Sequence, residues 1–295
     1  MEKFADDEAC REHLRQARWG DGFECPMCSE TEHWGYIKTR RLWECYECNY
    51  QCSITTATIM QDTKLPLRKW FLAAYLVFTT KKGITSHDLA RKLGVKQETA
   101  WYLQQKLARV VKKRYGRELF GLVEADEAYV GGQGSKLGRS TDKVLVMGLV
   151  EDKGDSAGNL HLRVLPGAAR AVVEPVVLER VAWGTTIRTD GWSSYGRLQD
   201  HGYKHEPRIQ VTRGDAAENL PWVHLVFSNF KRVMGGVHTK ADRAKFQAYA
   251  DLFSHRFNYR ATLGKGLGIT LAGLGSTPVV TRREVREEDT IDLPH

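Results

Sequence analysis

Residues 122–132 read LVEADEAYVGG, a stretch that combines the pattern of a strand with a cluster of acids. Apolar and acidic residues alternate from Val123 to Asp126, which is the two-residue period of a β-strand. Glu124 and Asp126 therefore project from one face of the expected strand. Burying acids is unfavourable unless positive charge meets them, and Mg²⁺ held by carboxylates is the natural candidate. The alternative is an edge strand with one solvated face.

The composition is typical of a basic globular protein. The chain has 295 residues, enough for two or three domains, is 42% hydrophobic and carries a net charge of +8. This positive net charge favours a polyanionic binding partner. The apolar run over residues 70–78 is too short to cross a membrane, and the acidic N-terminus is unlike a signal peptide. A cytoplasmic, nucleoid-associated protein with reduced or metal-bound cysteines is expected.

Four of the six cysteines form two CxxC motifs sixteen residues apart: Cys25, Cys28, Cys45 and Cys48. This spacing is typical of a zinc ribbon, in which four thiolates hold one structural Zn²⁺ tetrahedrally. A redox motif needs a single CxxC pair, so a redox role does not explain both. Cys10 and Cys52 lie outside the pattern and are expected to be small buried or half-buried residues.

Between residues 65 and 115 the apolar residues follow a helical period. A short helix after Ser86, a turn at Gly94 and a longer helix over residues 96–111 form a helix-turn-helix pattern. The first residues of the second helix usually meet base edges in such a motif. The candidate DNA contacts are Lys96, Gln97, Thr99 and Tyr102. An ordinary helical hairpin is the alternative.

Three strands with short connections predict an antiparallel meander over residues 122–132, 144–151 and 159–165. A helix over residues 167–182 and a short strand ending at Asp190 follow, so this strand is expected to run parallel to the first. Ligand sites in α/β sheets gather at strand ends, which brings Asp190 to Asp126. This order of elements matches the ribonuclease H-like arrangement, and the fold class is therefore mixed α/β.

A helix over residues 222–234 should supply a third ligand, because two aspartates alone provide too few ligands for two divalent ions. This helix contains no acid. His224 and Lys231 are seven residues apart and share one face, which favours His224 as the ligand and Lys231 as a contact to DNA phosphate. Asn229 is the alternative ligand, and a packing role for His224 is the alternative without metal.

A final helix is predicted over residues 240–259, where Arg256 and Arg260 lie four residues apart on one face, a spacing suited to phosphate. Beyond residue 262 the chain is rich in glycine and then in charge, which predicts a loose tail. The predicted domains are an N-terminal helix with the zinc ribbon (1–60), a helix-turn-helix region (61–118), a catalytic domain (119–262) and a flexible tail (263–295).

In this order the segments resemble the DDE-superfamily transposases of bacterial insertion sequences, in the branch with an N-terminal zinc ribbon and an ISXO-type catalytic domain. The segments are CPMC…CYEC, WECYECNYQCSITTATIM, VEADEAYVGG, IRTDGWSSY, HLVFSNFKRVMGGVH and FSHRFNYR. The resemblance implies an RNase H-like core, catalytic Mg²⁺, and a homodimer that binds terminal inverted repeats and transfers the ends to target DNA. By position, Asp126 and Asp190 match the first two catalytic acids, and the four CxxC cysteines match the zinc ligands. Lys231, Arg256 and Arg260 match basic positions of the family.

Two positions depart from the family pattern. The third catalytic residue is usually Glu, whereas the matching helix here has no acid, and Leu252 stands where the closing motif usually has Glu. Two other functions are therefore kept as alternatives. One is a DNA-binding regulator or inactive transposase derivative with the same zinc ribbon and helix-turn-helix. The other is a nuclease that hydrolyses RNA in hybrids.

Overall fold

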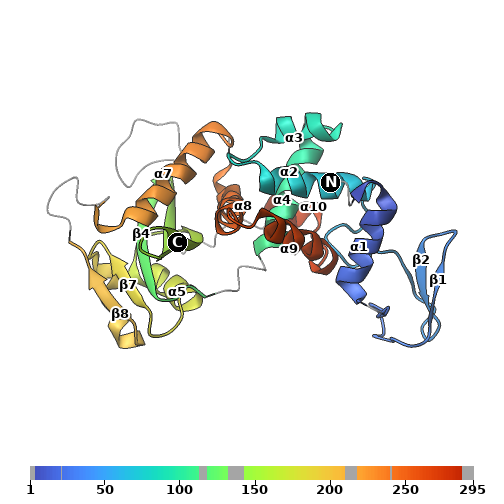
Figure 1. Cartoon of the computed structure of the whole chain (residues 1–295), viewed down its shortest axis with the longest axis horizontal. Coiled ribbons are helices and arrows are strands. Elements are labelled where there is room, and N and C mark those ends of the chain that lie inside the picture. Colours follow the sequence, from blue (N-terminus) through green and yellow to red (C-terminus); the bar gives the residue numbers. More distant parts are fainter. Residues whose placement is uncertain are drawn as a thin grey trace. The chain divides into compact units, whose positions relative to one another are not determined.

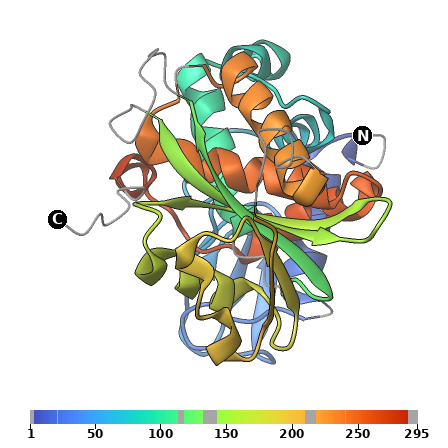
Figure 2. The same cartoon turned by 90° about the vertical axis from the view of Figure 1, so that its left-hand side faces the viewer.

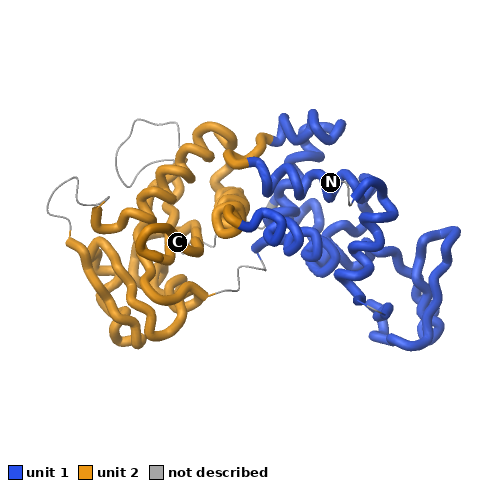
Figure 3. The backbone as a smooth tube through the Cα atoms, viewed as in Figure 1, with its two compact units in different colours: residues 1–80, 86–113, 262–286 blue, residues 81–85, 114–261, 287–295 orange. Residues whose placement is uncertain are grey.

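The computed structural model describes residues 4–20, 22–112, 118–131, 143–209, 218–239 and 241–287. The chain divides into two compact units (Figure 3). The first unit contains residues 1–80, 86–113 and 262–286, and the second contains residues 81–85, 114–261 and 287–295. The first unit is therefore assembled from both ends of the described chain.

The first unit begins with helix α1 (Asp7–Trp19), whose start is fixed by the carboxylate of Asp6, which accepts the backbone N–H of Ala9 at 2.8 Å. An antiparallel three-stranded sheet follows, formed by β1 (Trp34–Ile37), β2 (Leu42–Cys45) and β3 (Gln51–Cys52). The predicted N-terminal helix is confirmed, and β1 and β2 form an antiparallel hairpin between the two CxxC motifs.

Three helices follow in the same unit: α2 (Leu67–Thr79), α3 (Ser86–Leu93) and α4 (Gln97–Lys112). Gly94 has φ +60°, a left-handed conformation that favours glycine, and it makes the turn between α3 and α4. The predicted short helix, glycine turn and longer helix are present. The predicted core positions of the longer helix are buried: Ala100, Leu103 and Leu107.

The prediction of a loose tail from residue 263 is wrong for the described part of that segment, which forms helices α9 (Leu263–Ser276) and α10 (Arg282–Glu287). Helix α9 contacts α1, α2 and α4, and its Leu271 and Leu274 are buried. Five glycines lower its intrinsic helix propensity, but they allow close packing, as at Gly275 against the backbone of Leu14. Tertiary packing therefore outweighs the local sequence signal.

The second unit is built on a five-stranded mixed sheet in the order β6-β5-β4-β7-β8. Strands β4 (Leu122–Val130), β5 (Val144–Asp152) and β6 (Ala157–Leu165) form an antiparallel meander. After helix α5 (Arg170–Arg180), β7 (Thr186–Thr189) pairs with β4 in parallel, as predicted. Strand β8 (Lys204–Pro207), in a segment interpreted as a loop, was not predicted because it is a four-residue edge strand.

Helices α5 and α7 (Pro221–Gly236) lie on opposite faces of this sheet (Figures 1 and 2). On the α5 face, Val123 and Ala125 join a buried cluster with Val173 and Val177. On the other face, α7 approaches β5 at Gly148, where an added Cβ would lie 2.9 Å from a side-chain carbon of Val223. The absent side chain thus sets how closely α7 packs on the sheet.

Helix α8 (Phe246–Asn258) covers the edge strand β6. The Asn258 side chain accepts the backbone N–H of Leu160 at 2.7 Å and donates to its carbonyl at 2.9 Å. The Gln247 side chain makes the same pair of contacts, with the N–H of Val164 and the carbonyl of Leu162. These amides close an edge that would otherwise offer unpaired backbone groups. The predicted final helix is shorter than expected, and Lys240 at its predicted start lies outside the described residues.

No helix in the described ranges is both long and apolar enough to span a bilayer.

Candidate functional site

The two CxxC motifs come together in the first unit as one four-sulfur cluster. The ligand atoms of Cys25, Cys28, Cys45 and Cys48 all lie within 4.8 Å of one another. Individual Sγ–Sγ distances are 3.7 Å for Cys25 and Cys48, 3.6 Å for Cys28 and Cys45, and 3.4 Å for Cys28 and Cys48. These values approach the edge of a tetrahedron with Zn–S bonds of about 2.3 Å, which is roughly 3.8 Å. The donor set and spacing therefore fit a structural Zn²⁺, as predicted.

Backbone groups around the cluster support this interpretation. The N–H groups of Met27 and Cys28 point at the sulfur of Cys25, and the N–H of Tyr50 points at Cys48. Such bonds stabilise negative charge on thiolates that share a cation. The two remaining cysteines, Cys10 and Cys52, are buried as predicted, and burial raises the pKa of each thiol to about 11.

The second candidate centre lies in the middle of strand β4 (Leu122–Val130), where Asp126 faces helix α7. The Nε2 atom of His224 is 3.7 Å from Oδ2 of Asp126. This is too long for a hydrogen bond, and the buried Nε2 atom has no hydrogen-bond partner among the described residues. Burial is the main cause that lowers the pKa of His224 below its usual 6.5, so a neutral imidazole faces the acid.

Another acid lies near this pair, and we call Asp126, Asp190 and His224 the acidic site. Burial is the main cause that raises the pKa of Asp126 to about 7, the charges of Glu127 and Asp190 act in the same direction, and Lys231 opposes them. Asp190 directly follows β7, and it accepts the N–H of Trp192 at 2.9 Å, which fixes its carboxylate. The structure thus brings Asp190 near Asp126, as predicted from the strand ends.

Glu127, the third acid of the stretch over residues 122–132, has no role predicted from the sequence. Because successive residues of a strand alternate in direction, it points to the face opposite Asp126, where it accepts the hydroxyl of fully buried Tyr195. Burial is the main cause that raises the pKa of Glu127 to about 7, with Asp190 adding to the effect. The alternation of residues in the strand could not predict this contact, because Tyr195 is 68 residues away from Glu127 in the chain.

Glu124 does not extend the acidic site but holds helix α7 in place. Its carboxylate is fully buried and accepts the backbone N–H of Val223 at 2.8 Å, with Trp222 N–H as a further donor. The residue before the helix, Leu220, offers no side-chain acceptor, so an acid on β4 caps α7 from outside. The predicted shared face of Glu124 and Asp126 is confirmed, since both meet α7.

A second contact fixes the start of α7. The carboxylate of Asp152 on β5 accepts the indole N–H of Trp222 at 3.0 Å and also pairs with Arg188 at 3.2 Å. Arg188 lies on β7, two residues before Asp190. The chain segments that carry Asp126, Asp190 and His224 are therefore tied together by polar contacts around the helix start.

The donors of the acidic site suit a divalent cation, since two oxygens and a neutral imidazole nitrogen are common ligands. An ion bound at about 2.1 Å from each donor could bridge the 3.7 Å between Asp126 and His224. Within the described residues, only the four cysteines place three or more donors within 4.8 Å of one another. The donors of the acidic site are therefore spaced more widely than the four sulfurs of the zinc cluster.

The two candidate third ligands lie on different flanks of α7. Successive residues turn by about 100°, so His224 and Lys231 share one flank of the buried stripe and Asn229 lies on the other. The charge of Lys231 acts on both Asp126 and His224. Asn229 instead lines a cationic pocket between α7 and α8 together with Arg256 and Arg260. The geometry favours His224 over Asn229.

The predicted DNA contacts on α4 differ in exposure. Lys96 and Gln97 are exposed, and Gln97 donates to the hydroxyl of Ser86 at 2.7 Å. Thr99 and Tyr102 are half-buried, because the segment around α10 lies against the first turns of α4. Thr99 and Tyr102 line a small pocket there with Arg282 and Arg286, and both arginines pair with Glu98.

Comparison with known proteins gives a consistent result. Residues 118–258 match the family of ISXO2-like transposase domains, and residues 5–51 match the transposase zinc-ribbon domain. The chain is also similar to a protein of Halobacterium salinarum described as an uncharacterized protein in transposable element ISH50. The two are 27% identical over 235 residues, which cover 73% of this chain and 77% of the relative.

Proposed function

The chain carries the zinc-ribbon and catalytic-type domains of an ISXO2-like insertion-sequence transposase, and we propose that it cleaves the ends of its element and transfers them to target DNA. Membership of this family implies a DNA-cleaving class of enzyme. In this proposal, Asp126, Asp190 and His224 would hold a divalent metal ion, which the sequence predicts to be Mg²⁺. The zinc ribbon and the exposed start of α4 would bind terminal inverted repeats, with the protein acting as a dimer.

Each group at the acidic site has a role in this proposal. Asp126 offers carboxylate oxygens from the middle of β4, Asp190 offers them from the end of the adjacent strand β7, and His224 offers a ring nitrogen from α7. A bound divalent ion would activate the attacking oxygen and stabilise the leaving oxygen of the phosphodiester. Lys231, on the His224 flank of the helix, would hold the scissile phosphate. Glu124 and Asp152 keep α7 in register with the sheet, so the three donors stay in position.

The observation that carries the proposal is the approach of the unpartnered His224 Nε2 to Asp126 at 3.7 Å, next to the Asp190 strand end. A packing role for His224 explains its burial, but it leaves a polar nitrogen facing an acid without a partner. A shared cation satisfies both groups.

The test uses supercoiled donor DNA that carries the ends of the element. Wild type is expected to nick this DNA only when a divalent metal is added, and Asp126→Ala to lose cleavage by at least about a thousandfold while binding the ends unchanged. Asp155→Ala, which removes an exposed acid in the turn between β5 and β6 of the same sheet, is the control and should cleave normally. If Asp126→Ala still cut the donor, the assignment of the site would fail.

Two other outcomes of the same assay would favour other functions. Binding by wild type without any metal-dependent nicking would favour a DNA-binding regulator. Preferential cleavage of RNA–DNA hybrids would favour a ribonuclease.

A further inference from the structure

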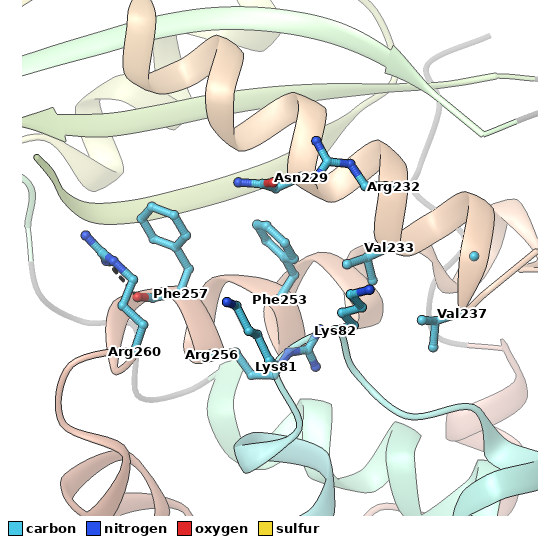
Figure 4. Close-up of a pocket in the computed structure, with 11 residues that line it drawn as sticks. Lys81, Lys82, Asn229, Arg232, Val233, Val237, Phe253, Arg256, Phe257 and Arg260 are labelled. Atoms are coloured by element: carbon cyan, nitrogen blue, oxygen red, sulfur yellow. Dashed lines mark hydrogen bonds between the residues drawn. The ribbon is translucent and has the colours of Figure 1, made fainter.

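The second unit contains a pocket that the acidic site does not use. It has a volume of about 590 Å³ and lies between α7 and α8, with residues 81–82 on a third side (Figure 4). This volume is within the range of about 300–1,000 Å³ that is usual for small-molecule sites. Its α7 wall is the Asn229 flank, opposite the flank that carries His224. The pocket is therefore a separate site rather than an extension of the metal centre.

The lining combines positive charge with aromatic surface. Five of the eleven lining residues are cations and none is an acid: Lys81, Lys82, Arg232, Arg256 and Arg260. Phe253 and Phe257 form the apolar part, with their ring centroids 6.3 Å apart and their planes nearly parallel. In Figure 4 these rings lie between the lysines on one side and Asn229 on the other. A ligand that fits must carry both a negative charge and an apolar or aromatic surface.

The five cations are not equivalent. The guanidinium of Arg260 donates to the carbonyls of Ala157 and Phe257 and lies 4.1 Å above the ring of Phe257, so it belongs to the wall. Lys81, Lys82 and Arg232 are exposed, and none of them forms an ion pair with a described residue. These three are the groups available to an incoming anion.

A nucleotide that has left the base stack meets both requirements, because its phosphate is anionic and its base has two aromatic faces. A base inside a duplex cannot stack on the aromatic wall of the pocket, since both its faces are covered by neighbouring bases. We propose that this pocket binds one unstacked nucleotide of single-stranded DNA. Its base lies against Phe257 and Arg260, and its phosphates lie on Lys81, Lys82 and Arg232. This inference rests on the proposed function only in choosing DNA as the nucleic acid.

The first experiment separates phosphate contacts from base contacts. Binding of the full-length protein to fluorescein-labelled dT12, to an abasic 12-mer with the same phosphates and to a 12-base-pair duplex is measured by anisotropy without added divalent metal. Wild type is expected to bind dT12 about five- to a hundredfold more tightly than the abasic strand, which is the usual range for one stacked base. Equal affinity for dT12 and the abasic strand would overturn the proposal, and competition by polyglutamate in that case would assign the pocket to an acidic peptide.

Matched variants locate the effect in the pocket. The double variant Lys81→Ala/Lys82→Ala should weaken dT12 binding and reduce the slope of log Kd against log salt by about 1.4, since each phosphate contact on a single strand contributes roughly 0.7. Lys204→Ala/Arg208→Ala removes one charge from strand β8 and one from the residue after it, and should change neither property. If the two double variants lose the same affinity, the lysines contribute only general charge and the pocket assignment fails.

The aromatic variant isolates the base contact. Phe257→Leu keeps most of the side-chain volume and should abolish the preference for dT12 over the abasic strand while leaving the salt slope unchanged. Phe120→Leu, at an exposed ring of the same unit, should keep the preference. Thermal unfolding of each variant verifies folding, and Arg232→Ala, at an exposed position, replaces the lysine double variant if that variant unfolds. Asp126→Asn should bind dT12 as wild type does. Failure of the cleavage assay with this binding pattern intact would therefore count against the proposed function alone.

Discussion

At the scale of single residues, the proposed metal site contains the imidazole of His224 at a position where the transposases that this chain resembles usually have a carboxylate. Mg²⁺ is a hard cation that prefers oxygen ligands, whereas first-row transition ions also accept imidazole nitrogen. We therefore expect Mn²⁺ to bind wild type at least about tenfold more tightly than Mg²⁺, and His224→Glu to narrow that ratio. Isothermal titration of both ions measures binding directly, and cleavage in each ion measures the consequence. An unchanged ratio in His224→Glu would show that His224 is not a ligand.

Another histidine gives the second unit a predictable response to acid. Burial, with the charges of Arg180 and Arg163, lowers the pKa of His161 to about 3. Below its usual value of about 6.5 the unfolded chain takes up a proton that the folded chain excludes, so lowering the pH favours unfolding. The free energy of unfolding therefore falls by about 1.4 kcal/mol per pH unit, or by roughly 2 kcal/mol between pH 6.5 and pH 5. Above pH 6.5 the contribution is fully present.

The variant His161→Gln removes this titration. Urea unfolding of both proteins at pH 7, 6 and 5 should give unfolding free energies that converge as the pH falls, because only the wild type loses the histidine contribution. Parallel pH profiles for the two proteins would contradict the prediction.

The limits of sequence reading at this scale follow from distance along the chain. His224 was predicted because it shares a helix face with Lys231, a relation contained within seven residues. The partners of Glu124 and Glu127 lie far from them in sequence, at Val223 and Tyr195. No local pattern distinguishes an acid that caps a distant helix from one that binds metal, so two of the three neighbouring acids received their roles only from the structure.

At the scale of elements, the packing of α7 on the sheet depends on one glycine. A Cβ at Gly148 would lie 2.9 Å from Val223 and 3.0 Å from Phe227, both buried side chains. Gly148→Ala should therefore shift α7, lower the unfolding free energy by about 1–3 kcal/mol and reduce cleavage, because His224 moves with the helix. Gly167→Ala is the control, since nothing lies within 4 Å of its added Cβ. Equal stability of the two variants in urea would contradict this account of the helix position.

The zinc ribbon is an element with little core of its own. Its strands span two to four residues each, so bound metal is expected to supply much of the folding free energy. Cys45→Ser should lose stoichiometric zinc, and amide hydrogens of residues 34–52 should exchange faster while those of β4 and β5 do not. Cys52→Ser also alters a buried thiol but should retain zinc, since Cys52 lies outside the cluster. Full zinc content in Cys45→Ser would refute the four-cysteine assignment.

Elements with a strong local period were predictable, and those stabilised from outside were not. The alternation in β4 places apolar residues on the α5 face and acids on the α7 face, and the helical period in α7 follows from one buried face. Strand β8 is short, lies at the sheet edge and alternates weakly, so its sequence does not distinguish it from a loop. Helix α9 contains five glycines, and its helical state depends on burial against helices far away in sequence.

At the scale of the whole molecule, the order of a first part with the zinc ribbon and a second part with the mixed sheet could be predicted, and the return of the chain to the first unit could not. The order of motifs is linear in the sequence, and the family matches follow the same order. Residues 262–286, however, belong with residues 1–80 and 86–113. Glycine-rich composition suggested a tail, whereas the buried leucines of α9 make this segment part of the first unit's core.

Deleting residues 262–295 distinguishes a tail from a core element. Deletion of a loose tail would leave the stability of the first unit unchanged. Removal of α9 instead uncovers apolar surface on α1, α2 and α4, and the loss of Leu271 and Leu274 alone should cost about 3–6 kcal/mol, at roughly 1.5–3 kcal/mol for each buried leucine. Hydrogen exchange should therefore accelerate in peptides from α1 and α2 and remain unchanged in peptides from β4 and β5, and binding to the element ends should weaken. Deleting only residues 288–295 is the control and should leave exchange in α1 and α2 as in the full chain. If the longer deletion also left this exchange unchanged, α9 would contribute nothing to the stability of the first unit, and the C-terminal segment would behave as the tail that its composition suggests.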